Sequence, residues 1–385
     1  MRCKTLGSIA NISSGGTPSK RVESFWEGDI PWVSAKTLHG EAVRDSSLRI
    51  SVEGLRQGSR LASKGDILVL TRGSGLFKMI PIAWVESPVA FNQDVKCLSV
   101  SNYLDARYLF YWLLSSRDFI SANLETTGIG AGKIDTQFLL EMKVAWPDRD
   151  IREKIVNILD AITLKIGLNS RINDHLLELA NAMFDRSIEA GSCVIPLGKI
   201  IQLEDALRIP LNRQQREQRR GVYPYYGAAS IMDYVNDYLF DGVRLLLGED
   251  GTVSTDGGYP MLQYVWGKYW VNNHAHVIRS SSTYSLETIY LALRKTPIAP
   301  ATTGAVQKKI SQTNLKKLMV KMPTSFDDDK CSTIFAEMRS IIDETERLES
   351  LRDTLLPKLM SGEIDVSQGD LTQLNGHLSE NSISI

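Results

Sequence analysis

The chain repeats itself, and this repetition limits its possible folds more than any other feature of the sequence. Short similar segments occur in the same order in both halves, at offsets of about 175 to 190 residues. They are LGSI at 6–9 and LGKI at 197–200, GDILVL at 65–70 and GVRLLL at 242–247, AFNQDV at 90–95 and VNNHAH at 271–276, TG at 127–128 and 303–304, and VAWP at 144–147 and VKMP at 320–323. Each match is weak, but their shared order indicates that one structural unit occurs twice.

Both repeats begin with a part of the same character, at residues 1–146 and 194–323. Short runs of β-branched and aromatic residues alternate there with Gly, Pro, Asn and Ser, as is typical of strands and turns. One helix is predicted in each part, over residues 106–114 and 286–294. This pattern predicts two compact mixed α/β domains with irregular strands.

Both repeats end in a predicted long helix with an apolar stripe. Residues 150–188 carry Ile155, Ile162, Asn169, Leu176 and Met183 at intervals of seven, with Ile158, Ile172 and Leu179 between them. Residues 328–361 carry Ile334, Met338, Ile341, Thr345, Leu348, Leu355 and Leu359, mostly at steps of four and three. A spacing near 3.5 residues is typical of a coiled-coil seam, and polar seam residues commonly fix its register. The alternative is an ordinary amphipathic helix packed on its own domain. The presence of two matching stripes makes this alternative less favourable.

Two residues interrupt these helices. Gly167 costs about 1 kcal/mol relative to Ala inside a helix. Pro357 is expected to kink or end the second helix near Leu355 and Leu356, because proline lacks the amide hydrogen and crowds the preceding turn. The polar, Ser- and Asn-rich segment after residue 367 predicts a disordered tail.

Charge and composition exclude several classes of protein. The chain has 44 basic and 45 acidic residues, a net charge of -1, which argues against a general polyanion binder. Any contact with nucleic acid therefore needs local basic patches or partner chains. The absence of a long apolar run or a signal-like start predicts a cytoplasmic protein without membrane contact. The 4 cysteines are too far apart along the chain for a metal clip, and a disulfide framework is not expected.

Several motifs together resemble one known family. In the first repeat these are GGTPS at 15–19, FWEGDIPWVS at 25–34, Asn92-Gln93, and Thr127-Gly128 followed by Ile134. In the second they are YPYYG at 223–227, GEDG at 248–251, NNHAH at 272–276 and TGA at 303–305, followed by LLPKLMSGEI at 355–364. The pattern resembles the target recognition domains of specificity subunits in type I restriction–modification systems, from about residue 4 to about residue 366.

The resemblance implies an α+β fold: two similar mixed α/β target recognition domains separated by a pair of long antiparallel coiled-coil helices, with an internal pseudo-twofold repeat. We expect the first recognition domain at 1–149, the central helix at 150–190, the second recognition domain at 191–326, the C-terminal helix at 327–364 and a flexible tail at 365–385.

The resemblance also implies a function without catalysis by this chain. Each domain would read one half of a bipartite site in double-stranded DNA, and the helices would set the spacer. Two modification subunits would methylate adenine N6 with S-adenosylmethionine, and a restriction subunit, a translocase and nuclease using ATP and Mg²⁺, could join them. A helix of 33 to 39 residues is about 50–58 Å long. That length corresponds to roughly fifteen base pairs of B-DNA.

Candidate DNA-binding residues are basic and polar residues on predicted loops, because phosphates and base edges are contacted by such groups. In the first domain they are Thr17, Ser19, Lys20, Arg21, Lys36, Arg72, Ser74 and Lys78. In the second they are Arg213, Arg216, Arg219 and Arg220, from a basic stretch that is either a DNA-facing loop or helix edge or a solvated charged loop. Lys308, like Lys133 and Lys309, lies in a repeated Thr-Gly segment and has a structural role as its alternative.

Catalytic and metal-binding alternatives have weaker support in the sequence. GIGAGK at 128–133 is no phosphate loop, because Ile134 follows the lysine and Thr127 replaces the first glycine. His274 and His276 lack an identifiable third metal ligand, which favours a structural role and predicts no metal site. The pair Glu249 and Asp250 could serve a hydrolase but also suits a turn. A repeat scaffold that binds protein or carbohydrate is a further alternative. Trp26 and Trp32 are expected to pack in the core or a loop.

Overall fold

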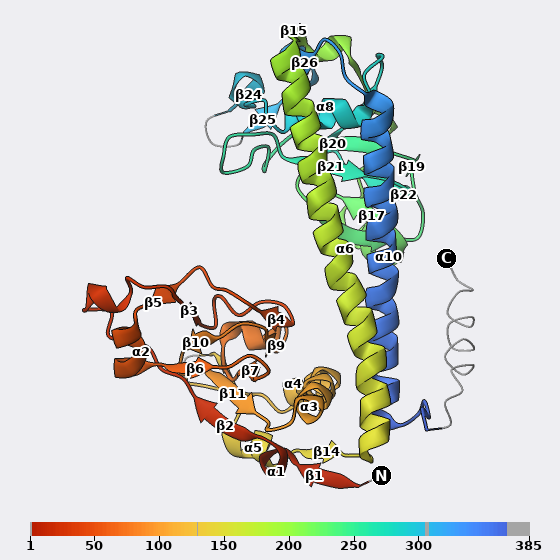
Figure 1. Ribbon diagram of the computed structural model, residues 1–385. Coiled ribbons are helices and arrows are strands. Elements are labelled where there is room, and N and C mark those ends of the chain that lie inside the picture. The colour runs from red at the N-terminus through yellow and green to blue at the C-terminus, as the bar shows by residue number, and fades with distance from the viewer. Residues whose placement is uncertain (1, 129, 305–307, 368–385) are drawn as a thin grey trace. The chain divides into compact units, whose positions relative to one another are not determined.

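The structure is a computed structural model that describes residues 2–128, 130–304 and 308–367 (Figure 1). The chain divides into two compact units. Among the described residues, unit 1 contains those up to 165 and those from 348 to 367, and unit 2 contains those from 166 to 347. The division falls within both long helices, α6 (Arg149–Ala190) and α10 (Asp328–Ser361). Residues 368–385, most of the predicted tail, lie outside the described residues.

Four small sheets build unit 1. The largest has the order β2-β11-β7-β9-β4, and a second has the order β5-β3-β10-β6. Two smaller sheets have the orders β12-β13-β8 and β1-β14. The strands are β1 (Cys3–Thr5), β2 (Asn11–Ser14), β3 (Ile30–Val33), β4 (Ala42–Val43), β5 (Arg49–Ile50), β6 (Arg60–Ala62), β7 (Ile67–Leu70), β8 (Arg72–Gly73), β9 (Ile82–Val85), β10 (Val89–Phe91), β11 (Val95–Ser99), β12 (Glu125–Thr126), β13 (Gly132–Lys133) and β14 (Lys143–Ala145).

Short helices cover these sheets and connect them. They are α1 (Leu6–Ile9), η1 (Glu23–Phe25), α2 (Val52–Gly58), η2 (Ser74–Phe77), α3 (Tyr103–Ser115), α4 (Arg117–Ala122) and α5 (Thr136–Glu141). The Asn102 side chain caps α3 by accepting a hydrogen bond from the Asp105 amide. Nearly every residue of α3 from 106 to 114 is buried, so this helix belongs to the core of unit 1. The helix predicted over 106–114 is therefore present.

Unit 2 has the same kind of sheets. One has the order β16-β23-β20-β21, another has the order β18-β17-β22-β19, and two pairs are β15-β26 and β24-β25. The strands are β15 (Ser192–Pro196), β16 (Ile201–Leu203), β17 (Arg220–Tyr226), β18 (Ile231–Val235), β19 (Phe240–Asp241), β20 (Arg244–Gly248), β21 (Leu262–Val265), β22 (Lys268–Val271), β23 (Ala275–Ser280), β24 (Thr302–Thr303), β25 (Lys309–Ile310) and β26 (Met319–Pro323). The helices are η3 (Leu197–Lys199), η4 (Asp205–Leu207), α7 (Arg213–Gln218), α8 (Leu286–Leu293), η5 (Ala299–Ala301) and α9 (Gln312–Lys317).

The strand orders confirm the internal repeat. The core β2-β11-β7-β9 of unit 1 corresponds to β16-β23-β20-β21 of unit 2, and the pair β1-β14 corresponds to β15-β26. A parallel pair also recurs, β3 with β10 in unit 1 and β17 with β22 in unit 2. The predicted α+β class and the two similar mixed domains are thus confirmed.

The long helices pack against each other within each unit (Figure 1). In unit 1, Ile155 and Leu159 of α6 share a buried core with Leu355 and Leu359 of α10. In unit 2, Phe184 of α6 shares a core with residues 331–335 at the start of α10. Early residues of one helix thus meet late residues of the other, so the pair is antiparallel.

Of the two outcomes expected for Pro357 in α10, a kink or an end of the helix, the second is wrong. Pro357 does not end the helix, which continues to Ser361. Leu355, Leu356, Leu359 and Met360, on both sides of the proline, are buried in the core of unit 1. Burial of these large apolar side chains offsets the lost backbone hydrogen bond and the steric crowding that a proline introduces.

Candidate functional site

The first-domain candidate residues lie on connecting segments of unit 1. The segments follow β2, follow β3, and run from β8 through η2; they carry Thr17, Ser19, Lys20, Arg21, Lys36, Arg72, Ser74 and Lys78. All of these side chains except that of Thr17 are exposed. The Thr17 hydroxyl donates a hydrogen bond to Gln93 Oε1 at 2.7 Å, which joins the first segment to the turn after β10. These positions are accessible to a ligand, and their contact with DNA stays a prediction.

A glycine pair shapes the first of these segments. Gly16 donates a backbone hydrogen bond to Phe91 O at 2.9 Å. A Cβ atom at Gly15 would lie 2.1 Å from the same oxygen, so only glycine allows this close approach. Trp32, 5% exposed, donates from its indole nitrogen to Gly16 O and packs edge-on against Trp26 with ring centroids 5.0 Å apart. The two tryptophans thus have the packing role that the sequence predicted.

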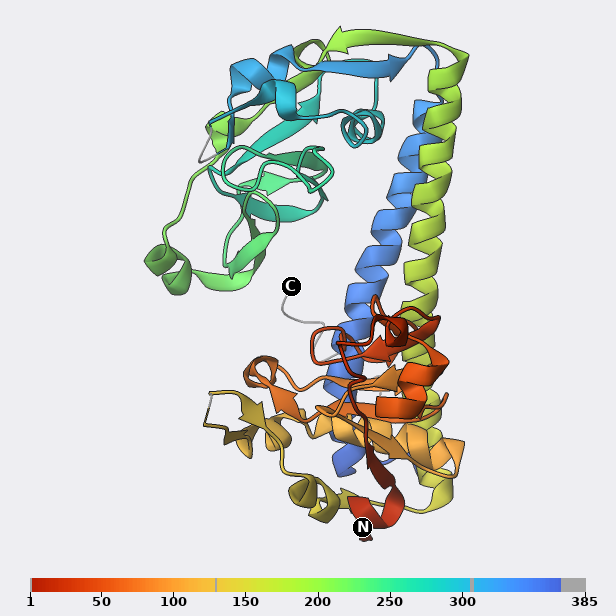
Figure 2. The ribbon, with the colours of Figure 1, turned by 90° about the vertical axis from the view of Figure 1, so that its left-hand side faces the viewer.

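The basic stretch of unit 2 forms a short helix, α7. The Asn212 side chain caps it, and Gln215 completes a capping box with the Asn212 backbone. Figure 2 shows this green helix on the side of unit 2 away from α10. Part of the basic stretch is therefore a short helix, and its contact with DNA stays a prediction.

The four arginines of this stretch have different surroundings. Arg216 is half-buried, donates to Asp233 at 3.1 Å and to Leu211 O at 2.8 Å, and therefore stabilises the domain. Arg213 is exposed and pairs with Glu217 one turn away at 2.9 Å. Arg219 and Arg220 are exposed at the end of α7 and the start of β17.

The repeated Thr-Gly segments are equivalent parts of the two units. Each forms a small hairpin, β12 with β13 in unit 1 and β24 with β25 in unit 2. Lys133 pairs with Glu125 at 2.9 Å, and Lys309 pairs with Glu249 at 3.5 Å. Lys308 is exposed and its backbone oxygen accepts a hydrogen bond from the Gly251 amide at 3.2 Å. The second hairpin is thus tied to the end of β20.

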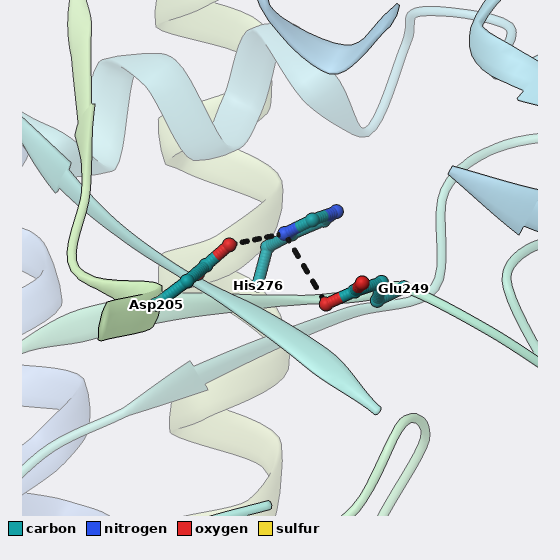
Figure 3. Close-up of side chains that lie close together, drawn as sticks. All are labelled: Asp205, Glu249 and His276. Atoms are coloured by element: carbon teal, nitrogen blue, oxygen red, sulfur yellow. Dashed lines mark hydrogen bonds and ion pairs between the residues drawn. The ribbon is translucent and has the colours of Figure 1, made fainter. Parts of the chain in front are cut away.

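A polar cluster of Asp205, Glu249 and His276 lies in the interior of unit 2 (Figure 3). His276 on β23 is fully buried, with Nδ1 2.6 Å from Asp205 Oδ2 and 3.7 Å from Glu249 Oε2. Its Nε2 lies 2.8 Å from Ile310 O. Both ring nitrogens therefore lie within hydrogen-bond distance of oxygen atoms. His276 therefore has the structural role expected from the sequence.

Asp205 has several further hydrogen-bond donors around it. They are the Val277 amide at 2.8 Å and Gln312 Nε2 at 2.7 Å, with Arg208 at 3.6 Å. Burial alone raises the pKa of this carboxyl, but His276, the Val277 amide and Arg208 outweigh burial and lower the pKa below its ordinary value. Asp205 is therefore an ionised, fully paired carboxylate.

The same cluster bears on metal binding and hydrolysis. Ligand atoms of Asp205, Glu249 and His276 lie within 4.8 Å of one another, a set that includes His276 but not His274. However, Arg208 Nη1 already lies 2.8 Å from Glu249 Oε2. A cation would have to displace these internal pairs, so we interpret the cluster as an ion-pair network.

Glu249 and Asp250 do not act as one carboxylate pair. Glu249 belongs to the buried network, whereas Asp250 accepts a hydrogen bond from His274 Nδ1. Because the two carboxylates have separate partners, the hydrolase alternative lacks the paired carboxylates that it requires.

Sequence reasoning missed Asp205, Arg208 and Gln312. Asp205 and His276 are 71 residues apart along the chain, and they meet because β16 pairs with β23. No local spacing signals such a contact. The available signal is His276, because a histidine at a buried strand position needs polar partners.

The predicted seam residues are all buried or half-buried on α6 and α10. They are Ile155, Ile162, Asn169, Leu176 and Met183 on α6, and Ile334, Met338, Ile341, Thr345, Leu348 and Leu355 on α10. Asn169 is fully buried in unit 2, and its Nδ2 donates to Glu344 at 2.9 Å and to Thr345 at 3.2 Å. Ile172 and Leu179, which the heptad pattern placed beside the seam, are instead 42% and 47% exposed.

The long helices are not membrane spans. Among the described residues, no helix is both long and apolar enough to cross a bilayer.

Comparison with known proteins gives a match to one family model. Residues 1–178 and 194–350 match the model described as the type I restriction modification DNA specificity domain. The two matched regions correspond to the two repeats.

Individual relatives agree with this match. The chain is 33% identical over 159 residues to the specificity subunit of the type I restriction enzyme EcoR124I/EcoR124II of Escherichia coli, covering 41% of this chain and 39% of that protein. It is 23% identical over 415 residues to the MjaIX specificity subunit of Methanocaldococcus jannaschii, covering 95% and 94%. The crystal structure of a type I restriction–modification S subunit from M. genitalium has a TM-score of 0.60 at 17% identity, covering 93% of this chain and 95% of that one. The structural likeness confirms the fold.

Proposed function

Because the chain belongs to the family of type I restriction modification DNA specificity domains, we propose that it is the sequence-reading subunit of a type I restriction–modification complex. The observation that carries the proposal is the double match to the specificity domain, which coincides with two units of the same strand order. Two similar recognition domains in one chain suit a DNA site with two half-sites. In the same way, the two subunits of a dimer bind one half-site each.

Each unit would contact DNA through its exposed connecting segments. In unit 1 these are the segments with Lys20, Lys36 and Lys78, and in unit 2 they are α7 and the β24–β25 hairpin. The net charge of -1 leaves little general attraction for phosphate. The isolated chain would therefore bind DNA weakly and with strong salt dependence, and stable binding would need partner chains.

The chemistry would belong to those partners. Two modification subunits would supply S-adenosylmethionine and methylate adenine N6, and a restriction subunit would use ATP and Mg²⁺. This division of labour is supported by the relatives, which are specificity subunits of type I restriction enzymes. It is also supported by the state of Glu249 and Asp250, whose separate internal partners leave no free carboxylate pair.

The long helices would set the distance between the half-sites. α6 has 42 residues and α10 has 34, and both contribute to the core of each unit. Seven residues added to both helices lengthen them by about 10 Å. That is close to 3 base pairs of B-DNA at 3.4 Å per pair.

Reconstitution with modification subunits tests the proposal directly. We expect sequence-specific adenine methylation only when this chain is present, and the methylated sites should share two half-sites with a fixed gap. Equal methylation of random DNA and site DNA by the complete complex would refute the proposal.

The spacing role has its own test. Seven residues are inserted into α6 at the level of Asn169 and into α10 at the level of Thr345, which are hydrogen-bonded partners. The gap should grow by about 3 base pairs, with both half-sites unchanged. The same insertion into α6 alone is the control, because it disrupts the pairing of the helices. An unchanged gap in the double insertion would exclude the spacing role.

A further inference from the structure

A short backbone frame at the end of β7 in unit 1 carries the side chains of Arg72, Asp94 and Lys133. The Ile134 amide donates to Thr71 O at 2.8 Å, and the Thr71 amide donates to Asp94 O at 2.8 Å. These bonds join the end of β7, the turn before β11 and the β13 strand. Arg72, the next residue, pairs in the ladder with Lys133.

The corresponding frame of unit 2 has the same hydrogen bonds. The Ile310 amide donates to Glu249 O at 2.8 Å, and the Glu249 amide donates to His274 O at 2.8 Å. Asp250, the next residue, forms a bridge with Lys309. Backbone geometry therefore makes each residue of this frame the counterpart of one in unit 1.

Arg72 is thus equivalent to Asp250, and Asp94 is equivalent to His274. The two lysines, Lys133 and Lys309, occupy a third equivalent position. At the first position the sign of the charge is reversed between the units, at the second an aspartate is exchanged for a histidine, and the backbone and the third position are kept. The hydrogen bonds of the frame named above join backbone atoms, so they do not require a particular side chain at these positions. The fold therefore gives no reason for the reversal.

In unit 1 the edge presents hydrogen-bond donors. The Arg72 side chain is exposed, and no acidic group in the described part of the chain lies within ion-pair distance of it. Lys96 lies nearby on β11. Burial lowers the pKa of Lys96, and the positive charge of Arg72 lowers it further. A guanidinium without an ion-pair partner is suited to a ligand with acceptor atoms, and the neighbouring Asp94 carboxylate accepts a hydrogen bond from Asn92 Nδ2.

In unit 2 the same edge presents hydrogen-bond acceptors. The Asp250 carboxylate, 19% exposed, binds His274 Nδ1 and thereby holds the ring with its Nδ1 hydrogen inward. The imidazole itself is 45% exposed. When the ring is uncharged and Nδ1 is the donor, Nε2 is an acceptor.

We propose that these equivalent edges each read one base pair of a half-site, with opposite hydrogen-bond polarity in the two units. Arg72 is matched to guanine, whose O6 and N7 accept two hydrogen bonds in the major groove. His274 Nε2, oriented by Asp250, is matched to the exocyclic amino group of cytosine or adenine, the donors in that groove. The inference rests on the proposed function and deepens it, because it assigns base-reading residues within each domain.

The test uses the full complex with its modification subunits and maps all methylated adenines in genomic DNA. Arg72→Ala and Arg72→Lys should both lose the preference for guanine at one position of one half-site, about ten-fold or more, since neither provides the paired donors of a guanidinium. His274→Ala and Asp250→Asn should relax one position of the other half-site, and the base lost there distinguishes cytosine from adenine. Arg56→Ala and Asp256→Ala, exposed residues of units 1 and 2 outside the two edges, should leave both half-sites unchanged.

Three outcomes overturn the inference. In the first, Arg72→Lys keeps the full site, which would make Arg72 a phosphate contact. In the second, methylation falls equally at all sequences. In the third, His274→Ala and Asp250→Asn keep the second half-site intact. Failure of the proposed function itself is recognised separately, because the complex with the unaltered chain would then show no sequence preference at all.

Discussion

Replacing Asp205 with alanine should destabilise unit 2 more than any other single change in the polar network. Its side chain is 3% exposed and accepts hydrogen bonds from His276 Nδ1 at 2.6 Å, the Val277 amide at 2.8 Å and Gln312 Nε2 at 2.7 Å. A buried donor without an acceptor costs about 1–3 kcal/mol, and breaking a buried ion pair costs about 3–5 kcal/mol. These contributions overlap, so we expect a total loss of about 3–5 kcal/mol.

Native-state hydrogen exchange is the appropriate assay, because a chain of two units need not unfold in one step. The amides of β16 and β23, which border Asp205, should lose protection by the expected free energy. The amides of β11 in unit 1 should be unchanged and serve as an internal reference. Asp205→Asn keeps one acceptor oxygen in the same place, so its loss should be smaller, about 1–3 kcal/mol.

Two results would refute this reasoning. A loss below about 1 kcal/mol for Asp205→Ala would mean that the donors find other partners or water. Equal loss of protection in β11 would mean that the effect is general and does not arise from the network around His276.

Three further predictions follow from buried polar groups. The pKa of Asp205 is lower in the folded protein than in the unfolded chain. Its contribution to the stability of unit 2 is therefore complete above the unfolded pKa of about 3.9 and is lost as the pH falls through the lower folded pKa. Asp205→Asn should flatten this dependence of the unit 2 melting temperature on acid pH. Asp160→Ala should cost unit 1 about 2–4 kcal/mol in exchange protection of α3, because Arg107, 7% exposed, would lose its carboxylate partner; a loss below 1 kcal/mol would contradict the pairing. Asn169→Leu should leave the melting temperature unchanged or raise it, because the buried Oδ1 of Asn169 has no hydrogen-bond partner in the described structure. Disulfide trapping of cysteine pairs along α6 and α10 should then reveal additional registers of the two helices. A single unchanged register would show that Asn169 does not set the register.

The repeat and the long helices could be predicted because their signals are local and periodic. Segment order identified the two units, and heptad spacing identified α6 and α10. The exact register of the repeat could not be read in the same way: the hydrogen bonds make Leu70 equivalent to Gly248, one residue away from the alignment suggested by the sequence. One extra residue in the turn before β20 causes this shift, and only strand pairing reveals it.

The same distinction explains the exposed residues Ile172 and Leu179. Their spacing satisfies a heptad pattern, but a 3.6-residue helix turns them away from a seam that follows Asn169 and Leu176. Periodicity predicts that a helix has an apolar stripe, and it does not determine which part of a broad stripe meets the partner helix. That choice depends on contacts with α10, which are distant along the chain.

The polar network of unit 2 could not be predicted from the sequence, for a related reason. Lys96 and His276 occupy equivalent positions on β11 and β23. In unit 1 the half-buried Lys96 reaches the Ser14 hydroxyl, whereas in unit 2 the fully buried His276 requires Asp205 and Ile310 O. A substitution in one copy of the repeat thus comes with a compensating set of partners from elsewhere in the same copy.

Two recognition domains that bind different half-sites need a backbone that stays the same when the side chains at the binding edge change. The hydrogen bonds that hold the edge near Arg72 and Asp250 join backbone atoms, so they persist whatever side chains the edge presents. Side chains at the edge can then change sign or polarity without rebuilding the domain, as the exchange of Arg72 for Asp250 illustrates. Because the frame is the same in both units, transfer of the unit 2 residues His274 and Asp250 to the equivalent positions of unit 1 should change one base of its half-site and preserve the fold.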